Sequence, residues 1–289
     1  MQIQPCGPLR GEITVPGDKS ISHRAVMLGA LANGTTHITG FLMGEDCLST
    51  IDCFRKMGVE INITDDEVIV EGVGLHGLEA PSEALYTGNS GTTTRLLCGI
   101  LAGQPFTVTM SGDPSIQKRP MGRVMKPLRE MGASIEGKND NFCPLTLFPS
   151  ELHGIEYRLP VASAQLKSAI LLAGLYAEGQ TTVIEPAPSR DHTERMFRAL
   201  GVEIETSGST ITLDPPEDLH AVDIAVPGDI SSAAFFLVAG AIVPGSELTI
   251  KNVGVNPTRT GVLDVLRDMG ADITESNFRD EAEPMCDLT

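Results

Sequence analysis

A recurring order of apolar and polar positions organises the chain. Stretches whose apolar residues recur at helical spacing end near a glycine and lead into an alternating stretch rich in β-branched residues. This unit occurs four times, at residues 50–63, 124–137, 193–206 and 262–275. A glycine just after the last helical turn is typical of helix ends. Each copy therefore predicts a helix followed directly by a strand.

A second, more apolar helix precedes each of these units. Its copies share a start rich in Ser and Thr, an apolar stretch, a glycine stop and a β-branched strand, and they span residues 22–40, 92–112, 163–185 and 231–252. A short strand comes before each copy, in GEITV, ALYT, YRLPV and VDIAV. Helices that are apolar nearly all round are typical of buried positions. The pattern predicts a mixed α/β fold of repeated β-α-β-α-β units with further strand pairs, helices inside and sheets around them.

Composition changes this picture in two ways. With 289 residues, 41% of them hydrophobic, the chain is long enough for two domain cores. Aromatic residues make up only 4% and Trp is absent, so the cores must consist mainly of Ala, Val, Ile, Leu and Met. The net charge of −17, with no long basic run, argues against a nucleic-acid partner. A small anionic ligand bound in a local basic pocket remains compatible with this negative net charge.

The patterns of Cys, His and hydropathy further narrow the classes of protein to which this chain can belong. The six Cys form no C-x-x-C pair, which favours reduced thiols and a cytoplasmic location. The His residues show no zinc-ligand spacing, so we expect no metal. The N-terminal segment has neither a signal-peptide nor a transit-peptide pattern. The longest apolar run, 233–243, is too short to cross a bilayer, so we expect a buried helix and no membrane partner.

Candidate chemistry lies in the turns between strand and helix. The stretch VPGDKSISHR at 15–24 has a close echo, VPGDISSAAF, at 226–235, and only the first carries Lys19 and Arg24. The repeated units account for the recurrence of the turn. Backbone N–H groups at a helix start, together with the helix dipole, attract phosphate or carboxylate. The first turn therefore predicts an anion site, while the second favours a structural turn whose Asp229 could still face the cleft.

Repeats two and three carry similar turns, GNSGTTTR at 88–95 and SAQLK at 163–167. Gly91 would let a ligand approach the backbone closely, and Arg119 and Lys167 would add positive charge. Ser, Thr, Asp and Gly are also ordinary helix caps, and any single turn could be no more than that. Three such turns accompanied by basic residues favour a site for a multiply anionic ligand. In the RDHTE segment, we interpret His192 as a polar surface residue.

A set of motifs carries a resemblance to a known family. GDKSISHR, GNSGTTTR, QKRPM, SAQLKSA, RDHTE and NPTRTG, together with the repeat plan, resemble the 3-phosphoshikimate 1-carboxyvinyltransferases, also called EPSP synthases. The resemblance runs from the first residues to about residue 275. The sequences SAQLK and RDHTE are similar to those of the class II branch of the family.

The resemblance implies a fold and an activity. Family members have two lobes, each of three β-α-β-α-β-β units, in the inside-out α/β prism of the enolpyruvyl transferases. They transfer the enolpyruvyl group of phosphoenolpyruvate to the 5-hydroxyl of shikimate 3-phosphate and release phosphate, in the shikimate pathway to chorismate and the aromatic amino acids. They are cytoplasmic monomers that use small anionic substrates and no metal or organic cofactor.

The resemblance also assigns roles by motif. Lys19 would contact both substrates and take part in the proton transfers at C3 of phosphoenolpyruvate. The residues expected to bind shikimate 3-phosphate are Lys19, Ser20, Arg24, Ser163, Ala164, Gln165 and Ser189 or Arg190. Those expected to bind phosphoenolpyruvate are Lys19, Gly91, Arg119 and Gln165.

The family's repeat plan also gives expected lobe boundaries. Residues 15–225 would form a complete first lobe of three repeats. Residues 1–14 and 226–289 would form a partial second lobe that lacks two of its three repeats. The family's catalytic Asp, its Lys-Glu-x-x-Arg stretch and further Arg and Lys residues have no counterpart in this sequence. We therefore expect this chain alone to bind substrate but to show little or no turnover.

Two alternatives stay open. One is an enolpyruvyl transferase that acts on another acceptor, such as UDP-N-acetylglucosamine. That family carries a Cys in the loop corresponding to residues 112–119, where this chain has none, which disfavours it. The other is a non-catalytic anion-binding protein built from the same repeats.

Overall fold

The computed structural model describes residues 7–65 and 67–289. Its helices are α1 (Lys19–Leu31), α2 (Glu45–Lys56), α3 (Gly91–Ala102), α4 (Gly122–Glu130), α5 (Ala164–Gly174), α6 (His192–Ala199), α7 (Ile230–Ile242), α8 (Gly261–Asp268) and the short 3-10 helix η1 (Ile116–Lys118). Its strands are β1 (Arg10–Thr14), β2 (Asn33–Thr39), β3 (Glu60–Ile63), β4 (Glu67–Val73), β5 (Leu85–Tyr86), β6 (Val108–Ser111), β7 (Ser134–Lys138), β8 (Phe142–Phe148), β9 (Glu156–Arg158), β10 (Thr181–Ile184), β11 (Ile204–Ser207), β12 (Thr210–Leu213), β13 (Ile224–Ala225), β14 (Glu247–Gly254), β15 (Glu275–Asp280) and β16 (Pro284–Leu288).

The predicted repeats are present. The apolar copies form α1, α3, α5 and α7, and the helix–glycine–strand copies form α2, α4, α6 and α8 with the strands after them. The fourth copy differs, because its strand begins at Glu275 and not directly after Gly270. In the intervening segment Ala271 and Ile273 pack on the core, and the backbones of Thr274 and Thr289 exchange two hydrogen bonds of 2.9 and 3.0 Å.

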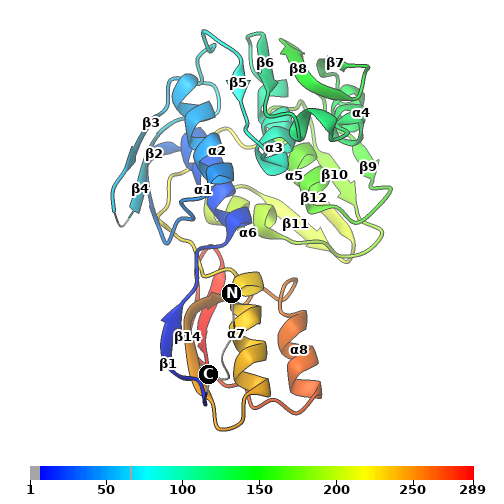
Figure 1. The fold of residues 1–289 in the computed structure, drawn as a ribbon. Coiled ribbons are helices and arrows are strands. Elements are labelled where there is room, and N and C mark those ends of the chain that lie inside the picture. Colours follow the sequence, from blue (N-terminus) through cyan, green and yellow to red (C-terminus); the bar gives the residue numbers. More distant parts are fainter. Residues whose placement is uncertain (1–6, 66) are drawn as a thin grey trace.

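Four four-stranded sheets share one plan. Their strand orders are β13-β2-β4-β3, β5-β6-β8-β7, β9-β10-β12-β11 and β1-β14-β16-β15. In each sheet the first pair of strands is parallel and the other two pairs are antiparallel. The first three sheets surround α1, α3 and α5 in the larger part of the molecule, and the fourth lies with α7 and α8 in the smaller part (Figure 1).

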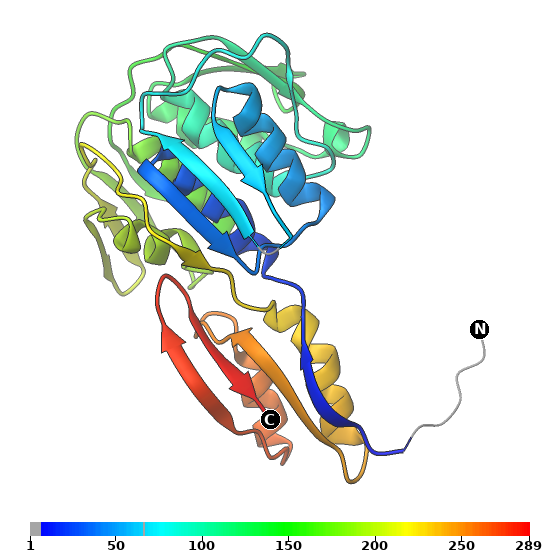
Figure 2. The same cartoon turned by 90° about the vertical axis from the view of Figure 1, so that its left-hand side faces the viewer.

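Two strands are exchanged between these parts. Strand β1 leads into α1 yet pairs with β14 in the smaller part. Strand β13 leads into α7 yet pairs with β2 in the larger part. The chain therefore passes between the parts twice, at residues 15–18 and 226–229, and Figure 2 shows the two connections near one another.

The two connecting turns are the repeated VPGD stretches, and they pair with each other. Gly17 and Gly228 form an antiparallel bridge. The Asp18 N–H donates to the Pro227 carbonyl at 2.8 Å, and the Asp229 N–H donates to the Pro16 carbonyl at 2.9 Å. The two VPGD turns therefore do more than mark the start of a repeat, because each turn is the hydrogen-bonding partner of the other.

The larger part has helices inside and sheets outside, as predicted. Helix α5 is buried from Leu166 to Gly174, and α1 is buried from Ile21 to Leu31. Helices α3 and α5 pack so closely that a Cβ atom on Gly99 would lie 2.2 Å from the Ala169 carbonyl oxygen. The close approach of these backbones depends on the missing side chain.

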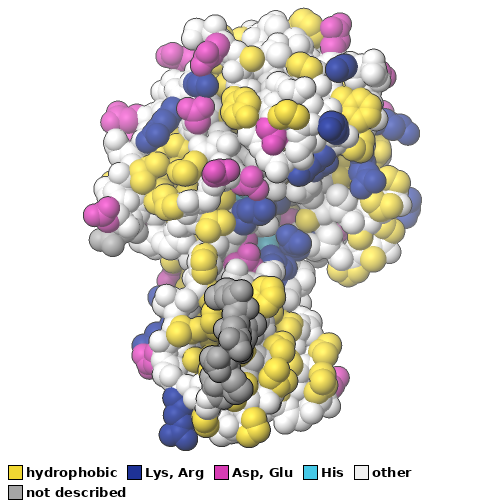
Figure 3. All heavy atoms as spheres, viewed as in Figure 1, with side chains coloured by type: hydrophobic (Ala, Val, Ile, Leu, Met, Phe, Trp, Pro, Cys, Tyr) yellow, Lys and Arg dark blue, Asp and Glu magenta, His cyan; other side chains and the backbone are white. Residues whose placement is uncertain are grey.

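The smaller part has its own core, which covers α7 on one side, so the expectation that the helix at 233–243 is buried is wrong for its other side. Ile230, Ala233 and Leu237 are buried there, whereas Phe235 and Ile242 are 79% and 70% exposed. Figure 3 shows the resulting hydrophobic surface on the smaller part.

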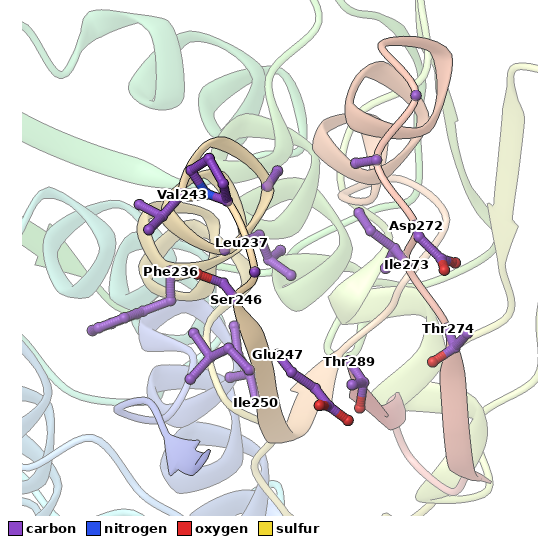
Figure 4. A pocket seen from close by; sticks show the side chains of 17 residues that line it. Phe236, Leu237, Val243, Ser246, Glu247, Ile250, Asp272, Ile273, Thr274 and Thr289 are labelled. Atoms are coloured by element: carbon purple, nitrogen blue, oxygen red, sulfur yellow. The ribbon is translucent and has the colours of Figure 1, made fainter. Parts of the chain in front are cut away.

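A cavity of about 550 Å³ opens between α7, β14 and residues 270–274 (Figure 4). Its described lining residues include no Lys, Arg or His, so this cavity does not fit the predicted anion chemistry.

The described helices include none with the length and apolar character needed to cross a lipid bilayer.

We predict that Gly99→Ala destabilises the chain by roughly 1–3 kcal/mol, because the added methyl group meets a backbone oxygen that cannot move independently. Gly240→Ala in α7 is the matched control. The nearest atom to a Cβ there is 4.0 Å away, so it should be neutral or stabilise by up to about 1 kcal/mol. Urea unfolding of both variants measures this difference, and equal effects would contradict the described packing of α3 on α5.

Candidate functional site

A cavity of about 320 Å³ lies where the larger and smaller parts meet. It is bounded by the first turns of α1, α3, α5, α6 and α7 and by the loop before α8. The lining residues are Lys19, Ser20, Arg24, Thr92, Ala164, Gln165, Arg190, His192, Asp229, Ser231 and Arg259. Lys and Arg side chains gather at this junction (Figure 3). Residues from the turns of repeats one, two and three therefore line one cavity.

The turns act as helix caps and also border the cavity. The side chains of Asp18, Ser90, Ser163 and Asp229 accept hydrogen bonds from backbone N–H groups in the first turns of α1, α3, α5 and α7. Each cap satisfies one of the free N–H groups of its helix, and the other first-turn groups remain available to a ligand. Capping and anion binding are compatible roles for these residues.

Arg24 is the most buried cation of the cavity, with 4% of its surface exposed. Its guanidinium donates to Thr193 Oγ1 at 2.8 Å, to Ser168 Oγ at 2.7 Å and to the Ser20 carbonyl at 2.9 Å. None of the carboxylates in the described part of the chain lies within 4 Å of it. Burial lowers the pKa of Arg24 to about 10, so it remains charged at neutral pH. A buried charge held only by neutral acceptors favours an anionic ligand.

Lys19 and Arg190 add positive charge on either side of Ser20. Lys19 is half exposed and reaches Asp46 at 3.2 Å. Arg190 donates to Ser20 Oγ at 3.3 Å. Burial lowers the pKa of Arg190, and the nearby charge of Arg259 lowers it further. The carboxylates of Asp18 and Asp229 act in the opposite direction and raise the pKa of Arg190, because they compensate part of this positive charge.

Arg259 is a residue of this site that had no role assigned from the sequence, although NPTRTG was noted as a motif. Its guanidinium bonds Asp18 at 3.1 Å, Asp229 at 3.2 Å and Ser231 Oγ at 2.8 Å. It thereby joins the carboxylates of both VPGD turns. The second turn carries no cation of its own, and this arginine reaches it from a loop 30 residues further along the chain.

Lys167 requires a correction, because it does not add charge to the cavity. Its side chain is buried, with Nζ 2.9 Å from a Glu185 oxygen and 2.7 Å from a Glu194 oxygen. The helical turn that places Ala164 and Gln165 at the cavity directs Lys167 inward, toward α6 and the end of β10. Its charge is compensated by these two carboxylates.

His192 also requires a correction, because it is not a surface residue. Only 1% of it is exposed, and its Nδ1 lies 2.6 Å from Glu283 Oε1. Asn256 donates to Glu283 at 3.1 Å and to Asp191 at 2.6 Å. The start of α6 is thus packed against the smaller part, a contact between distant segments that local sequence does not reveal. The Nε2 atom has no described hydrogen-bond partner, and the residue lines the cavity.

The remaining predicted site residues lie around the cavity without all lining it. Ser189 donates its hydroxyl to Glu185 and does not line the cavity. Arg119 donates to Asn89 at 2.7 Å. A Cβ atom on Gly91 would lie 3.3 Å from Arg119 Nη1, so these two residues are neighbours. Arg95 Nη1 would lie nearer still, at 2.7 Å, so two arginine side chains border this glycine.

Among residues 7–65 and 67–289, no group of three or more His, Cys, Asp or Glu side chains is arranged to hold a metal ion. The absence of a cofactor stays a prediction.

We predict that Lys167→Met destabilises the chain by about 3–5 kcal/mol, because it leaves two buried carboxylates without their cation. Lys56→Met is the control, since Lys56 also bridges two carboxylates, Asp52 and Glu83, each at 3.1 Å, but on the surface. That change should cost less than about 1 kcal/mol. Chemical denaturation at pH 7 compares them, and similar costs would contradict the burial described for Lys167.

A second prediction concerns pH and His23, whose Nδ1 lies 2.7 Å from Thr50 Oγ1. Burial, then the charges of Arg24 and Lys19, lower the pKa of His23 to about 3. The unfolded chain binds a proton there below pH 6.5, whereas the folded chain does so only near pH 3. The stability that His23 contributes is therefore complete above pH 6.5 and is lost as the pH falls toward 3.

Between pH 7 and pH 5, wild type should lose about 2 kcal/mol more of its free energy of unfolding than His23→Gln. Glutamine keeps a hydrogen-bonding group near Thr50. His153→Gln, at an exposed histidine, should retain the wild-type pH dependence. Parallel wild-type and His23→Gln curves would show that His23 binds a proton in the folded state.

Known proteins are similar to this chain over nearly its whole length. The family model for EPSP synthase (3-phosphoshikimate 1-carboxyvinyltransferase) matches residues 3–288. A 3-phosphoshikimate 1-carboxyvinyltransferase of Geobacillus thermodenitrificans is 62% identical over 283 residues, which cover 97% of this chain and 66% of the relative. One of Bacillus anthracis is 59% identical over 290 residues, which cover 99% of this chain and 68% of the relative. The chain spans about two thirds of the length of the curated relatives it matches.

Solved structures give the same result for the fold. An EPSP synthase from Acinetobacter baumannii superposes with a TM-score of 0.95 at 53% identity, covering 98% of this chain and 65% of that one. This likeness confirms the predicted enolpyruvyl transferase fold. Because the family model matches nearly the whole chain and the relatives are this similar over nearly all of it, the chain belongs to the EPSP synthase family.

Proposed function

We propose that the protein transfers the enolpyruvyl group of phosphoenolpyruvate to the 5-hydroxyl of shikimate 3-phosphate and releases phosphate, as a step toward chorismate. The observation that carries this proposal is the charge of the cavity between the two parts. Arg24 and Arg190 line it with no described carboxylate within 4 Å of either, in a chain whose net charge is −17. A multiply anionic small molecule complements such a cavity.

The shikimate 3-phosphate site would occupy this cavity. Its residues would be Lys19, Ser20, Arg24, Ala164, Gln165 and Arg190, with Ser163 at the start of α5 beside them. Of the two candidates near the start of α6, Arg190 lines the cavity whereas the Ser189 hydroxyl is bonded to Glu185. This contrast favours Arg190 as the phosphate ligand.

The phosphoenolpyruvate site would adjoin it at the start of α3. Gly91 and Arg119 lie together there, and Gln165 reaches toward α3 from the other side. The Gln165 side chain is fixed at both ends, because Oε1 accepts from Arg95 at 2.9 Å and Nε2 donates to Thr92 Oγ1 at 3.0 Å. Lys19 would contact both substrates at the junction.

The reaction would proceed by addition and then elimination. The 5-hydroxyl loses its proton as its oxygen bonds to C2 of phosphoenolpyruvate, and C3 gains a proton as the C2–C3 double bond becomes single, which gives a tetrahedral intermediate. Loss of a proton from C3 then expels the phosphate and leaves the enol ether. Lys19 is the candidate for part of the proton transfer, and the surrounding cations would stabilise the charge that develops on the phosphate.

We further propose that residues 15–225 form the first lobe and that residues 7–14 and 226–289 belong to the second, while residues 1–6, also assigned to the second lobe from the sequence, lie outside the described residues. The exchange of β1 and β13 and the separate core around α7 support this division. A monomeric, cytoplasmic protein without nucleic-acid or membrane partners belongs to the same proposal, and the acidic net charge supports the exclusion of nucleic acid.

A non-catalytic anion-binding role is the second candidate for this chain, because the charged cavity is formed by residues of this chain alone. Little or no turnover by the chain stays a prediction. The UDP-N-acetylglucosamine alternative remains disfavoured by the loop at residues 112–119, which contains no Cys.

Calorimetric titration with shikimate 3-phosphate tests the proposed acceptor, with unphosphorylated shikimate for comparison. We expect selective binding of the phosphorylated compound, weakened about tenfold or more by Lys19→Ala and by Ser163→Ala because each removes a contact to an anion. Lys126→Ala, which removes an exposed charge on α4, is the control and should bind like wild type. Equal binding of shikimate, or no effect of either site variant, would contradict the proposed acceptor.

A further inference from the structure

The loop between β10 and α6, residues 185–191, carries Arg190 to the substrate cavity with little backbone support. Two of its residues are prolines, which have no N–H group to donate. Within the described chain, no backbone–backbone hydrogen bond involves residues 186–190. Arg190 is exposed, and its guanidinium reaches Ser20 Oγ at a long 3.3 Å. Side-chain contacts must therefore hold the loop in the conformation that brings Arg190 to the cavity.

One lysine anchors both ends of this loop. Lys167, on α5, places Nζ 2.9 Å from a Glu185 oxygen and 2.7 Å from a Glu194 oxygen. Glu185 directly follows β10, and Glu194 lies in the first turn of α6, so the two carboxylates flank the loop. All three side chains are buried. This buried ion triad therefore ties together the two ends of the loop.

The Ser189 hydroxyl connects the loop to this triad. It donates to Glu185 Oε1, while Glu185 Oε2 accepts from Lys167 Nζ. Each oxygen of the carboxylate thus has its own donor, and the carboxylate cannot turn without losing one of them. Because Ser189 directly precedes Arg190 in the chain, this contact fixes the backbone from which the Arg190 side chain extends.

Lys167 also relates the loop to the start of α5. It lies one helical turn after Ala164, which lines the cavity. The Ser168 hydroxyl beside it lies 2.7 Å from Thr193 Oγ1, so α5 and α6 are joined at adjacent positions. A buried ion triad is a poor means of stabilisation alone, because apolar residues of similar volume often stabilise a core as well or better. Control of the loop gives these buried charges a function that apolar residues could not supply.

We propose that Lys167 and Glu185 are positioning residues, which act on the anionic ligand through Ser189 and Arg190. They hold the loop so that Arg190 and the start of α5 line the same cavity and can bind one phosphate group together. The inference rests on the proposed function for the identity of the ligand, and it adds residues that do not contact that ligand.

Calorimetric titration of Glu185→Gln, Arg190→Gln and the double variant with shikimate 3-phosphate tests the proposal. Glu185→Gln leaves Lys167 its Glu194 partner, so the fold is retained. A glutamine has one oxygen, so it cannot accept separately from Lys167 and Ser189. Each single variant should weaken binding about fivefold or more. The double variant should bind less than about twofold more weakly than Arg190→Gln, because Glu185 acts through Arg190. Multiplied losses would overturn the proposal, since independent structural effects add in free energy.

Ser189→Ala separates positioning from direct contact with the ligand. It should weaken binding about threefold or more in wild type but less than about twofold in Glu185→Gln, because both changes break the same link. Equal losses in both backgrounds would overturn the proposal, since the hydroxyl would then contact the ligand itself. Ser150→Ala is the matched control, because its hydroxyl also holds a loop, between Phe148 and Ser134, away from the cavity. It should bind like wild type, and a loss equal to that of Ser189→Ala would also overturn the proposal.

A measurement without ligand tests the positioning role independently of the proposed function. NMR relaxation of the backbone amides of Ser189 and Arg190 should show lower order in Glu185→Gln than in wild type, because the loop then loses a side-chain anchor. Unchanged order at both amides would overturn the proposal. Failure of wild type to bind shikimate 3-phosphate, with the order lowered as expected, would contradict only the proposed function.

Discussion

The pairing of the two VPGD turns is the constraint on which the site depends. Each turn carries the chain between the larger and smaller parts, and each supplies a backbone N–H to the other's proline carbonyl. Arg259 then joins their two carboxylates, Asp18 and Asp229, which cap α1 and α7. The starts of these helices are therefore held side by side, and the cavity between the parts lies where their free N–H groups meet. Glycine is required at the crossing, since a Cβ atom on Gly17 would lie 2.0 Å from the Gly40 carbonyl oxygen.

The two buried cations Lys167 and Arg24 differ in whether carboxylates compensate their charge. Lys167 is buried between two carboxylates, so its charge is internally balanced and stabilises the packing of α5 on α6. Arg24 is equally buried but is held by two hydroxyls and a carbonyl, so its charge remains available. Both side chains belong to apolar helices with similar starts. The difference lies in the partners that the fold brings to them, and it favours Arg24 over Lys167 as a cation for the proposed anionic ligand.

Local patterns predicted most of the fold because each repeat uses strong local signals. Apolar helical spacing, a terminal glycine and a β-branched strand located the eight long helices of the described chain and most of its strands. Strand β16 was missed, because PMCDL carries no alternation and is fixed only by its pairing between β14 and β15. The exchange of β1 and β13 has no signal in the local sequence, because it depends on pairing between distant strands, and only the lobe boundaries implied by the family resemblance anticipated it.

The site was predictable to the extent that its residues lie in the turns. Lys19, Ser20, Arg24, Ala164, Gln165 and Arg190 were assigned by motif and do line one cavity. Lys167 and His192 were misread because their partners, Glu185 with Glu194 and Glu283, come from other segments. Arg259 gained a role only when its loop was seen to reach both VPGD turns. Contacts across the two parts therefore account for what sequence reasoning could not supply.

A crystal structure of this chain with shikimate 3-phosphate tests the central claim most directly. The account predicts the ligand in the cavity between the parts, with its phosphate at the start of α5 near Arg190 and its carboxylate on Arg24, while Arg259 still bridges Asp18 and Asp229. Shikimate 3-phosphate bound elsewhere, or held there without contact to Arg24 or the start of α5, would contradict it.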